Sequence, residues 1–272
     1  MKTYRGFPKI IHQSHKSLEH LSSEDLKRVA KLKNLNPDWE WKFWTDEDNR
    51  NLIKEKYSWF LSTYDSYEFP IQRADAVRYF YMFEYGGIYL DLDMDALKPI
   101  ESLISKALDL ELEAIFGTPV PSTLLFDEYL NNYLAEKKIY NAILISKPHT
   151  EFWLLVHSLL KSRMSDYKYH TLPKEEKVFW STGPSLLGEA FKIYSSYSAY
   201  VGLYPFYYTN IDGVLFEGKY YPQTWKNSKF LDNLVEKGGV RRTPPEKIAE
   251  SFVNDSPFHF VHRSQKIWKE AL

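Results

Sequence analysis

The chain has 272 residues, of which 44% are hydrophobic and 26% charged, with a formal net charge of −1 and no cysteine. That size suits one large globular domain, the near-zero charge argues against nucleic acid as a partner, and the lack of cysteine excludes disulfides, thiolate metal sites and cysteine nucleophiles. No apolar run reaches the ~20 residues of a membrane span, so we expect a cytoplasmic protein without a transmembrane span and leave open a peripheral contact with a membrane.

The N-terminal part of the chain alternates between strand and helix patterns. The expected elements are a strand over Phe7–His12, a helix over about Glu24–Leu35 capped by Ser22 or Ser23, a strand over Trp39–Trp44 and a helix from Thr45-Asp46 to about Tyr57. Together with the next helix and strand, this order predicts an α/β fold with a mostly parallel sheet and helices on both faces.

The segment Ile71–Asp95 reads IQRADAVRYFYMFEYGGIYLDLDMD and is the most informative part of the sequence. Apolar residues recur at three- and four-residue intervals from Ala74, which predicts a helix. Pro70 suits the first turn of that helix, and Gly86-Gly87 suits its end because glycine adopts left-handed backbone angles freely. Ile88–Leu90 then reads as a short buried strand.

Three carboxylates, Asp91, Asp93 and Asp95, follow that strand at alternate positions. Alternate residues of a strand point the same way, so Asp91 and Asp93, and also Asp95 if the strand continues, can converge on one point. Carboxylates at the carboxyl end of a buried strand lie where open α/β sheets bind ligands, and hard oxygen ligands suit Mg2+ or Mn2+ bound to substrate phosphates. An isolated acidic pair of this kind more often only caps or solvates a turn.

Asp75 and Arg78 lie three residues apart on the predicted helix and therefore share a face. Such a pair can be a surface ion pair that contributes little to stability. Because the helix leads directly into the acidic strand end, the same face can also look toward the aspartates, where an arginine can bond sugar hydroxyls or phosphate.

The second half of the chain has a looser pattern. We expect, in order, a helix over Ser102–Leu110, a strand over Ala114–Phe116, a turn-rich link over Thr118–Pro121, a helix or loop over Phe126–Ala135, a strand over Ala142–Ile145, a helix from Pro148-His149 to about Met164, a charged and exposed stretch over Lys161–Lys177 and a helix over Ser185–Tyr194. From Tyr204 onward, short aromatic strands and loops predict an elaboration over the site or toward an acceptor. Without a linker or repeat, residues 1–272 read as one domain.

With these residues in view, Ile71–Asp93 resembles the core of the DxD-containing glycosyltransferases of family 32. That family includes initiating mannosyltransferases and mannosyl inositol phosphorylceramide synthases, and the order of Asp, Arg and DxD is also similar to that of large glucosylating toxins. Further segments follow in family order: PKIIHQS, WKFWTDED, YNAILISKPHTEFW, STGPSLL and VHRSQKIW. The last of these departs from the frequent His-x-x-x-Ser-Trp spacing of the family.

The resemblance implies a GT-A type, Rossmann-like fold with an aromatic-rich C-terminal elaboration. Residues 1–150 would bind a nucleotide-sugar, and residues 151–272 would form the acceptor side. The implied activity is retaining transfer of a hexose, from GDP-mannose or a UDP-hexose, to a glycan, glycolipid or polysaccharide acceptor, with Mn2+ or Mg2+ as cofactor.

The resemblance also implies roles for single residues. Asp93 would bind the metal ion directly, Asp91 would bind it through water or contact the ribose, and His262 would complete the metal shell. The implied donor-binding residues are Ile11, His12 and Gln13, which lie beside the nucleoside largely through their backbone, together with Asp75, Arg78, Asp91, Asn141 and Trp268. The implied catalytic residues are Asp75, Arg78, Asp91 and Asp93.

Two other functions remain open at this level. Aromatic residues make up 17% of the chain, and tyrosines such as those of Tyr204–Tyr208 can stack on sugars, which would suit a carbohydrate-binding module without catalysis. A metal-dependent phosphohydrolase could use the aspartates, although no further acidic or histidine ligand motif supports it. The sequence offers no dedicated carboxylate nucleophile, and we therefore expect a same-face attack in which the leaving phosphate accepts the proton of the acceptor.

Overall fold

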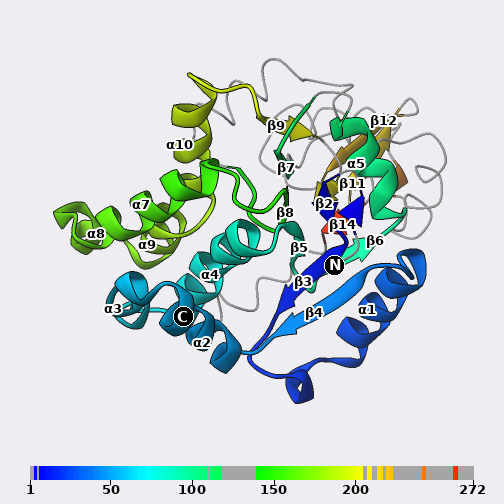
Figure 1. Cartoon of the computed structure of the whole chain (residues 1–272). Coiled ribbons are helices and arrows are strands. Elements are labelled where there is room, and N and C mark those ends of the chain that lie inside the picture. The colour runs from blue at the N-terminus through cyan, green and yellow to red at the C-terminus, as the bar shows by residue number, and fades with distance from the viewer. Residues whose placement is uncertain are drawn as a thin grey trace.

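The computed structural model describes residues 3–4, 6–108, 111–117, 139–204, 207–209, 213–216, 219–222, 241–242 and 260–262 (Figure 1). The segments expected over Thr118–Pro121 and Phe126–Ala135, and the candidate donor-binding residue Trp268, lie outside these residues. In the part of the chain that is described, no helix combines the length and the apolar character that crossing a membrane would require.

A six-stranded sheet with the order β4-β3-β5-β8-β7-β9 forms the centre of the fold. Its strands are β3 (Ile10–Ser14), β4 (Glu40–Trp44), β5 (Gly87–Leu90), β7 (Ala114–Gly117), β8 (Ile143–Ser146) and β9 (Val201–Tyr204). β8 is antiparallel to both of its neighbours, and the other pairs in this sheet are parallel. The predicted α/β fold with a mostly parallel sheet is therefore confirmed, and the carboxyl ends of the parallel strands meet the start of β8 at one edge.

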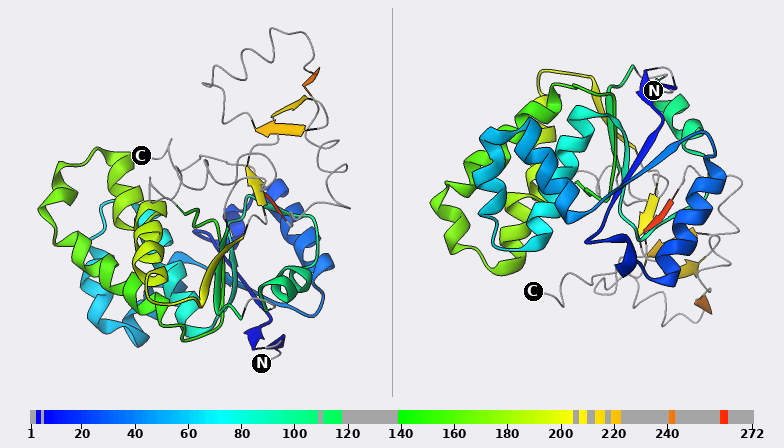
Figure 2. Two further views of the ribbon diagram at one scale, coloured as in Figure 1. Left: turned by 90° about the horizontal axis from the view of Figure 1, so that it is seen from above. Right: turned by 60° about the horizontal axis from the view of Figure 1, so that its bottom comes forward.

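Helices cover both faces of this sheet (Figure 2). They are α1 (Ser23–Leu35), α2 (Asp46–Lys56), α3 (Leu61–Asp65), α4 (Pro70–Glu84), α5 (Ile100–Leu108), α7 (Phe152–Met164), α8 (Tyr167–Thr171), α9 (Lys174–Ser181) and α10 (Pro184–Ser195), with short 3-10 turns at η1 (Leu18–His20) and η2 (Ser58–Phe60). Residues of α2, α4, α7 and α10 pack against one face, and residues of α1 and α5 pack against the other.

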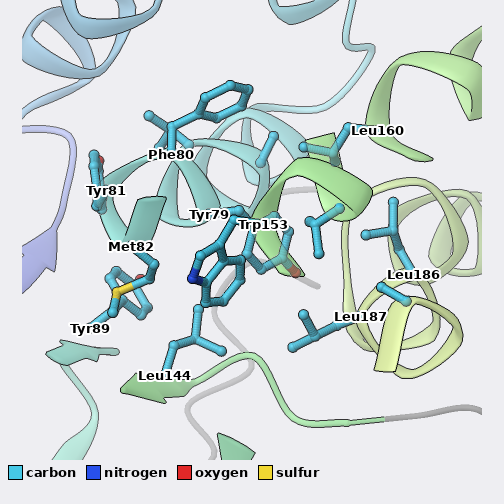
Figure 3. Packing of buried hydrophobic residues seen from close by; sticks show 14 of the residues in the cluster. Tyr79, Phe80, Tyr81, Met82, Tyr89, Leu144, Trp153, Leu160, Leu186 and Leu187 are labelled. Atoms are coloured by element: carbon cyan, nitrogen blue, oxygen red, sulfur yellow. The ribbon is translucent and has the colours of Figure 1, made fainter. Parts of the chain in front are cut away.

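Alternation along the strands produces these two hydrophobic clusters. In β5, Tyr89 belongs to the cluster under α4 and α7, whereas Ile88 and Leu90 belong to the cluster under α5, as successive strand residues must point to opposite faces. Figure 3 shows the first cluster, where Tyr79 on α4 meets Trp153 on α7, with stacked rings whose centroids are 5.8 Å apart.

The helix boundaries follow their capping residues closely. Ser22 caps α1 and Thr45 caps α2, each through a capping box with the aspartate three residues later. The helix expected from Pro148-His149 instead begins at Phe152, because His149 has a positive φ of 59° that an α-helix does not admit.

The stretch Lys161–Lys177 is largely exposed, as expected. It ends α7, forms α8 and begins α9, and Arg163 and Tyr169 are its buried residues. The short η2 and α3 elements at Ser58–Asp65 had no counterpart among the predicted elements.

Small sheets lie outside the central one. β10 (Tyr207–Thr209), β14 (Phe260–His262) and β6 (Met94–Ala96) form one three-stranded sheet. β12 (Lys219–Pro222), β11 (Gly213–Phe216) and β13 (Arg241–Arg242) form another, and β1 (Thr3–Tyr4) pairs with β2 (Phe7–Pro8). The short strands predicted beyond Tyr204 are thus present, and one of them, β10, is joined through β14 to the segment that follows Asp93.

Candidate functional site

The turn from α4 into β5 allows no side chain at either glycine. Gly86 has a φ of +62° and Gly87 a φ of +89°, both in the region that favours glycine. A Cβ on Gly87 would lie 2.5 Å from the carbonyl oxygen of Ile10, and one on Gly86 would lie 2.6 Å from the backbone nitrogen of Pro148. This close approach fixes the position of β5 beside β3, and with it the position of the aspartates that follow β5.

The segment Asp91-Leu92-Asp93 is a turn between β5 and β6. The N–H of Met94 donates to the carbonyl of Asp91 at 3.1 Å, and the N–H of Asp91 donates to the carbonyl of Ala142 at 2.9 Å. Arg28 of α1 donates from Nε to the carbonyl of Leu92 at 2.9 Å. The DxD segment is therefore held by backbone contacts at the carboxyl edge of the sheet.

Asp95 does not join the other two aspartates in the way that strand alternation would allow. It lies on β6, and its carboxylate forms an ion pair with Lys31 of α1 at 2.9 Å. The physical reason is the turn: the chain reverses within Asp91–Asp93, so the alternation of β5 does not extend to Asp95.

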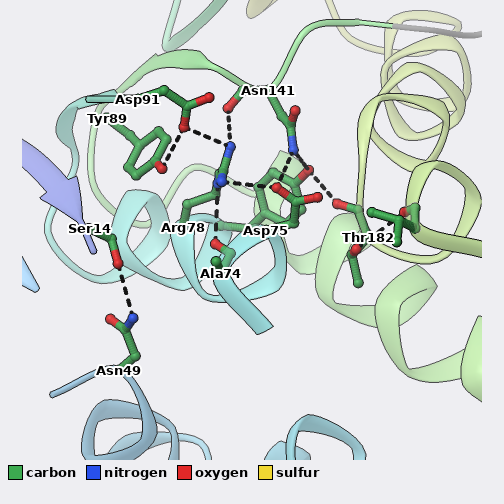
Figure 4. A network of polar contacts seen from close by, with 11 residues as sticks. Ser14, Asn49, Ala74, Asp75, Arg78, Tyr89, Asp91, Asn141 and Thr182 are labelled. Carbon is green, nitrogen blue, oxygen red and sulfur yellow. Dashed lines mark hydrogen bonds and ion pairs between the residues drawn. The ribbon is translucent and has the colours of Figure 1, made fainter. Parts of the chain in front are cut away.

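Arg78 is the hub of the site (Figure 4). Its side chain is only 5% exposed, and Nη2 lies 2.9 Å from Oδ1 of Asp75, while Nη1 lies 3.3 Å from Oδ1 of Asp91. The guanidinium also donates to the carbonyl oxygens of Asn141, at 2.8 Å, and Ala74, at 3.3 Å. One arginine thus joins α4, the DxD turn and the segment before β8.

Tyr89 contacts both Arg78 and Asp91. Its hydroxyl donates to Oδ1 of Asp91 at 2.7 Å, and its ring lies under the guanidinium of Arg78, with 4.5 Å between Cζ and the ring centroid. The side chain of Asp91 is 30% exposed, so this carboxylate is held by Tyr89 and Arg78 and remains partly accessible to solvent.

Asn141 completes the cluster from the segment before β8. Its Nδ2 donates to Oδ1 of Asp75 at 3.0 Å and lies 3.4 Å from the hydroxyl of Tyr79. The hydroxyl of Tyr79 donates in turn to the carbonyl of Thr182 at 2.7 Å. Asp75, Arg78, Asp91 and Asn141, four of the residues expected from the sequence, are therefore in direct contact.

The buried charges shift one another's protonation. Burial raises the pKa of Asp75 to about 7, opposed by the neighbouring charge of Arg78 and supported by the negative charge of Asp91. Burial alone would lower the pKa of Arg78, but Tyr89, Asp91 and Asp75 raise it, so the guanidinium stays charged.

The three candidates on β3 lie between the neighbouring strands β4 and β5. Ile11 is buried between β4 and β5. His12 donates from Nε2 to the carbonyl of Gly86 at 2.9 Å and accepts at Nδ1 from Trp44 at 3.1 Å; both ring nitrogens are used inside the core, and burial lowers its pKa to about 3. Gln13 approaches the site, with Nε2 3.4 Å from the carbonyl of Asp91.

His262 is described by its backbone alone. In the register of the small sheet, His262 of β14 pairs with Met94 of β6, the residue directly after Asp93. The fold thus places a C-terminal histidine beside the DxD turn. Tyr79, Tyr89 and the carbonyl of Thr182 were not expected from the sequence; only Tyr89, two residues before Asp91, offered a signal, because strand residues i and i+2 share a face.

The carboxylates of the DxD turn are of the type that binds a divalent cation. Asp91 offers a partly exposed carboxylate, and Asp93 lies in the same turn. Among the described residues, no group of three acidic or histidine side chains is arranged to hold a metal ion without further ligands. Mg2+ and Mn2+ characteristically take one or two protein carboxylates and complete their shell with water and substrate phosphates, which is the pattern that this turn can support.

Residues 22–108 match the family model described as the glycosyltransferase sugar-binding region containing a DXD motif. The chain is 34% identical over 191 residues to the mannosyl phosphorylinositol ceramide synthase CSH1 of Saccharomyces cerevisiae, covering 70% of this chain and 44% of that protein. It is 33% identical over 187 residues to the inositol phosphoceramide mannosyltransferase 1 of Schizosaccharomyces pombe, covering 68% and 51%.

Solved structures similar to the chain include mouse xyloside xylosyltransferase 1 in its apo form, at a TM-score of 0.47 and 9% identity, covering 96% of this chain and 98% of that one. Another is the PaToxG glycosyltransferase, at a TM-score of 0.46 and 15% identity, covering 70% of each chain. The chain spans about half, or less, of the length of the curated relatives named above. Residues 22–108 thus carry the sugar-binding region of the DXD-containing glycosyltransferases, and the resemblance of the chain to that family is supported by these relatives.

Proposed function

We propose that the chain is a retaining, metal-dependent glycosyltransferase that moves a hexose from a nucleotide-sugar, GDP-mannose or a UDP-hexose, to a glycan, glycolipid or polysaccharide acceptor. The observation that carries the proposal is the buried contact of Asp75, Arg78, Asp91 and Asn141 beside the DxD turn. GDP-mannose is the first donor to test, because the relatives at 33–34% identity are named as mannosyl-transferring enzymes. A cytoplasmic location stays a prediction.

In this proposal the buried cluster binds the donor sugar. Asp75 and Asn141 present a carboxylate and an amide at the edge of the sheet, where sugar hydroxyls can replace water as hydrogen-bond partners. Arg78 holds the carboxylate of Asp75 and the backbone carbonyl of Asn141, and it would place a positive charge near the leaving diphosphate. Ile11, His12 and Gln13 would lie beside the nucleoside through their backbone, and Trp268 would cover the donor.

The DxD turn would hold the metal ion, with Asp93 as a direct ligand, Asp91 as a ligand through water or a contact to the ribose, and His262 in the remaining shell. A bound Mn2+ or Mg2+ would supply Lewis-acid neutralisation of the charge that develops on the diphosphate. Tyr89 and Arg78 keep Asp91 in place for either role.

The proposed transfer proceeds on one face of the sugar. The bond between the anomeric carbon and the diphosphate oxygen breaks, the acceptor oxygen bonds to the same face of that carbon, and the proton of the acceptor passes to the departing phosphate. The protein residues orient the groups and stabilise the separating charges.

The test is release of nucleotide from a panel of GDP- and UDP-sugars in the presence of Mn2+, with the purified chain. We expect turnover of at least one donor, stabilisation against heat by the matching nucleotide with Mn2+, and loss of both in Asp93→Asn. Asp95→Asn is the matched control, since Asp95 pairs with Lys31 instead of facing the cluster, and it should retain turnover. Normal turnover by Asp93→Asn would refute the metal site, and stabilisation by free glycans alone would indicate a carbohydrate-binding module.

A further inference from the structure

Tyr79 is a buried tyrosine of α4 that lies outside the DxD motif and contacts the site residue Asn141. Its hydroxyl has a single hydrogen, which it donates to the carbonyl of Thr182 at 2.7 Å. At its interaction with Asn141, 3.4 Å away, the hydroxyl oxygen must therefore be the acceptor. That requirement determines which end of the Asn141 amide faces Tyr79: it must be the NH2 group.

The same nitrogen of Asn141 also donates to Oδ1 of Asp75 at 3.0 Å. Both hydrogens of the amide are then directed into the protein, one toward Asp75 and one toward Tyr79. None of the described residues donates a hydrogen bond to the amide oxygen Oδ1 of Asn141. The amide is thus oriented so that its oxygen is left as an acceptor for a ligand hydroxyl.

The partner of Tyr79 is itself held in place. The carbonyl of Thr182 belongs to the turn Ser181–Pro184 between α9 and α10. Gln72 of α4 donates to Oγ of Ser181 at 2.7 Å, and the N–H of Gly183 donates to the carbonyl of Val178 at 2.9 Å. This turn therefore presents a fixed acceptor to Tyr79.

The turn also supports the backbone on the other side of Asn141. The carbonyl of Pro184 accepts a hydrogen bond from the N–H of Ile139 at 3.1 Å. The segment before β8 is thus bound to the Ser181–Pro184 turn directly through Ile139 and indirectly through Tyr79, while Arg78 holds the carbonyl of Asn141 at 2.8 Å. Backbone and side chain of Asn141 are positioned by the same turn.

We propose that Tyr79 and the Ser181–Pro184 turn are positioning elements that fix the amide of Asn141 so that its Oδ1 accepts a hydrogen bond from a hydroxyl of the donor sugar. This inference rests on the proposed function and deepens it. Tyr79 does not touch the substrate; it acts through Asn141. Its effect should therefore appear in recognition of the sugar part of the donor and not in recognition of the nucleotide.

The test compares Tyr79→Phe with Tyr81→Phe. Tyr81 lies on the same helix, is equally buried, and directs its hydroxyl to Asn49, away from the site. We expect Tyr79→Phe to lower kcat/KM for the nucleotide-sugar by about tenfold, the effect of losing one buried hydrogen bond, while affinity for the free nucleotide with Mn2+ stays unchanged. Tyr81→Phe should leave both quantities near their wild-type values.

A double-variant cycle separates positioning from general loosening of the fold. In the background of Asn141→Ala, the further change Tyr79→Phe should cost little, because the amide that it orients is gone. An equal loss in both backgrounds, an unchanged kcat/KM in Tyr79→Phe, or a parallel loss of free-nucleotide affinity would overturn the inference. Ser181→Ala, which loosens the turn without touching Tyr79, is the second variant if Tyr79→Phe does not fold, and should also reduce kcat/KM for the nucleotide-sugar selectively.

Failure of the proposed function has a different signature. In that case the wild-type chain itself would neither release nucleotide from any donor nor be stabilised by nucleotide with Mn2+. If the wild type does both and the variants behave identically to it, only the positioning role of Tyr79 is rejected.

Discussion

At the scale of single residues, Arg78 is mostly committed to the protein. Of its five N–H groups, one is directed to Ala74, two on Nη1 face Asn141 and Asp91, and one on Nη2 faces Asp75. Among the described residues, the second hydrogen on Nη2 has no acceptor, and it can bond a ligand. Removing the arginine would therefore leave two carboxylates uncompensated, one of them buried, which costs more than a lost ligand contact.

Buried histidines give the stability of the protein a predictable dependence on pH. Burial lowers the pKa of His12 and of His157 to about 3, against an ordinary value of 6.5. Between pH 3 and 6.5 the unfolded chain protonates these two histidines and the folded chain does not. The contribution of His12 and His157 to the free energy of unfolding therefore falls as the pH drops through that range. Asp75, with its pKa raised to about 7, works in the opposite direction, because the folded state holds its proton between pH 3.8 and 7.

We predict that His157→Phe flattens this dependence. His157 lies in the core, stacked on Phe80 at 3.9 Å between ring centroids, and a phenylalanine keeps the ring without the proton. Between pH 6 and 5, the free energy of unfolding of the wild type should fall by about 1.4 kcal/mol per pH unit more than that of the variant. Urea denaturation at the two pH values measures this, and comparing slopes cancels any constant change in stability. Equal slopes would contradict it.

Three of the site residues that were expected from the sequence are charged. Asp75, Arg78 and Asp91 lie at positions fixed by a helix repeat and a strand end, which a pattern can reveal, whereas the uncharged Asn141 was expected only from the family resemblance. Tyr79 could not be found in this way, because a tyrosine in an apolar helix face is indistinguishable from core. Its role depends on a contact with Thr182, 103 residues away in the chain, and such a contact exists only after folding.

At the scale of elements, the passage from α4 to β5 sets the site geometry. The helix ends at Glu84, the strand begins at Gly87, and the carbonyl of Gly86 accepts a hydrogen bond from the core residue His12. The sequence signals here were strong, since Pro70 and the glycine pair mark the ends of α4. By contrast, the direction of β8 carried no local signal, because a short apolar strand reads the same whether it is parallel or antiparallel to its neighbours.

We predict that Gly87→Ala destabilises the fold by about 2–4 kcal/mol, since the substitution adds a steric clash with the backbone of Ile10 to an unfavourable positive φ. Gly6→Ala is the matched control. Gly6 has nearly the same φ, +90°, but a Cβ there would meet only the side chain of Lys147, at 3.6 Å. Chemical denaturation should show a loss of only about 1 kcal/mol for Gly6→Ala; equal losses in the two variants would show that the close approach of β3 is not the cause.

At the scale of the whole molecule, the C-terminal part of the chain returns to the DxD segment. β14 lies between β10 and β6, so a strand near the C-terminal end of the sequence pairs with the residues directly after Asp93. The central sheet contains none of these three strands. β6 contributes Met94 and Ala96 to the hydrophobic cluster under α5, but β14 and β10 are separated from the central sheet. Disturbing β14 should therefore affect the DxD segment more than it affects the packing of the central sheet.

This separation leads to a prediction for Val261→Pro. Val261 is the middle residue of β14 and pairs with Asp95 on one side and Tyr208 on the other. Proline removes a backbone donor in the interior of a sheet, so it should displace the strand that carries His262. We expect affinity for nucleotide with Mn2+ to fall about tenfold or more, the usual effect of disturbing the support of a metal ligand, with little change in the denaturation midpoint.

The matched control is Val214→Pro. Val214 lies in β11, which is likewise the central strand of a small sheet, between β12 and β13, and that sheet shares no described strand with the DxD segment. This variant should retain nucleotide affinity, as measured by titration calorimetry in the presence of Mn2+. If both proline variants lose it equally, the C-terminal part acts as one body on the site. If neither does, the pairing of β14 with β6 does not support the metal-binding turn, and His262 is not needed there.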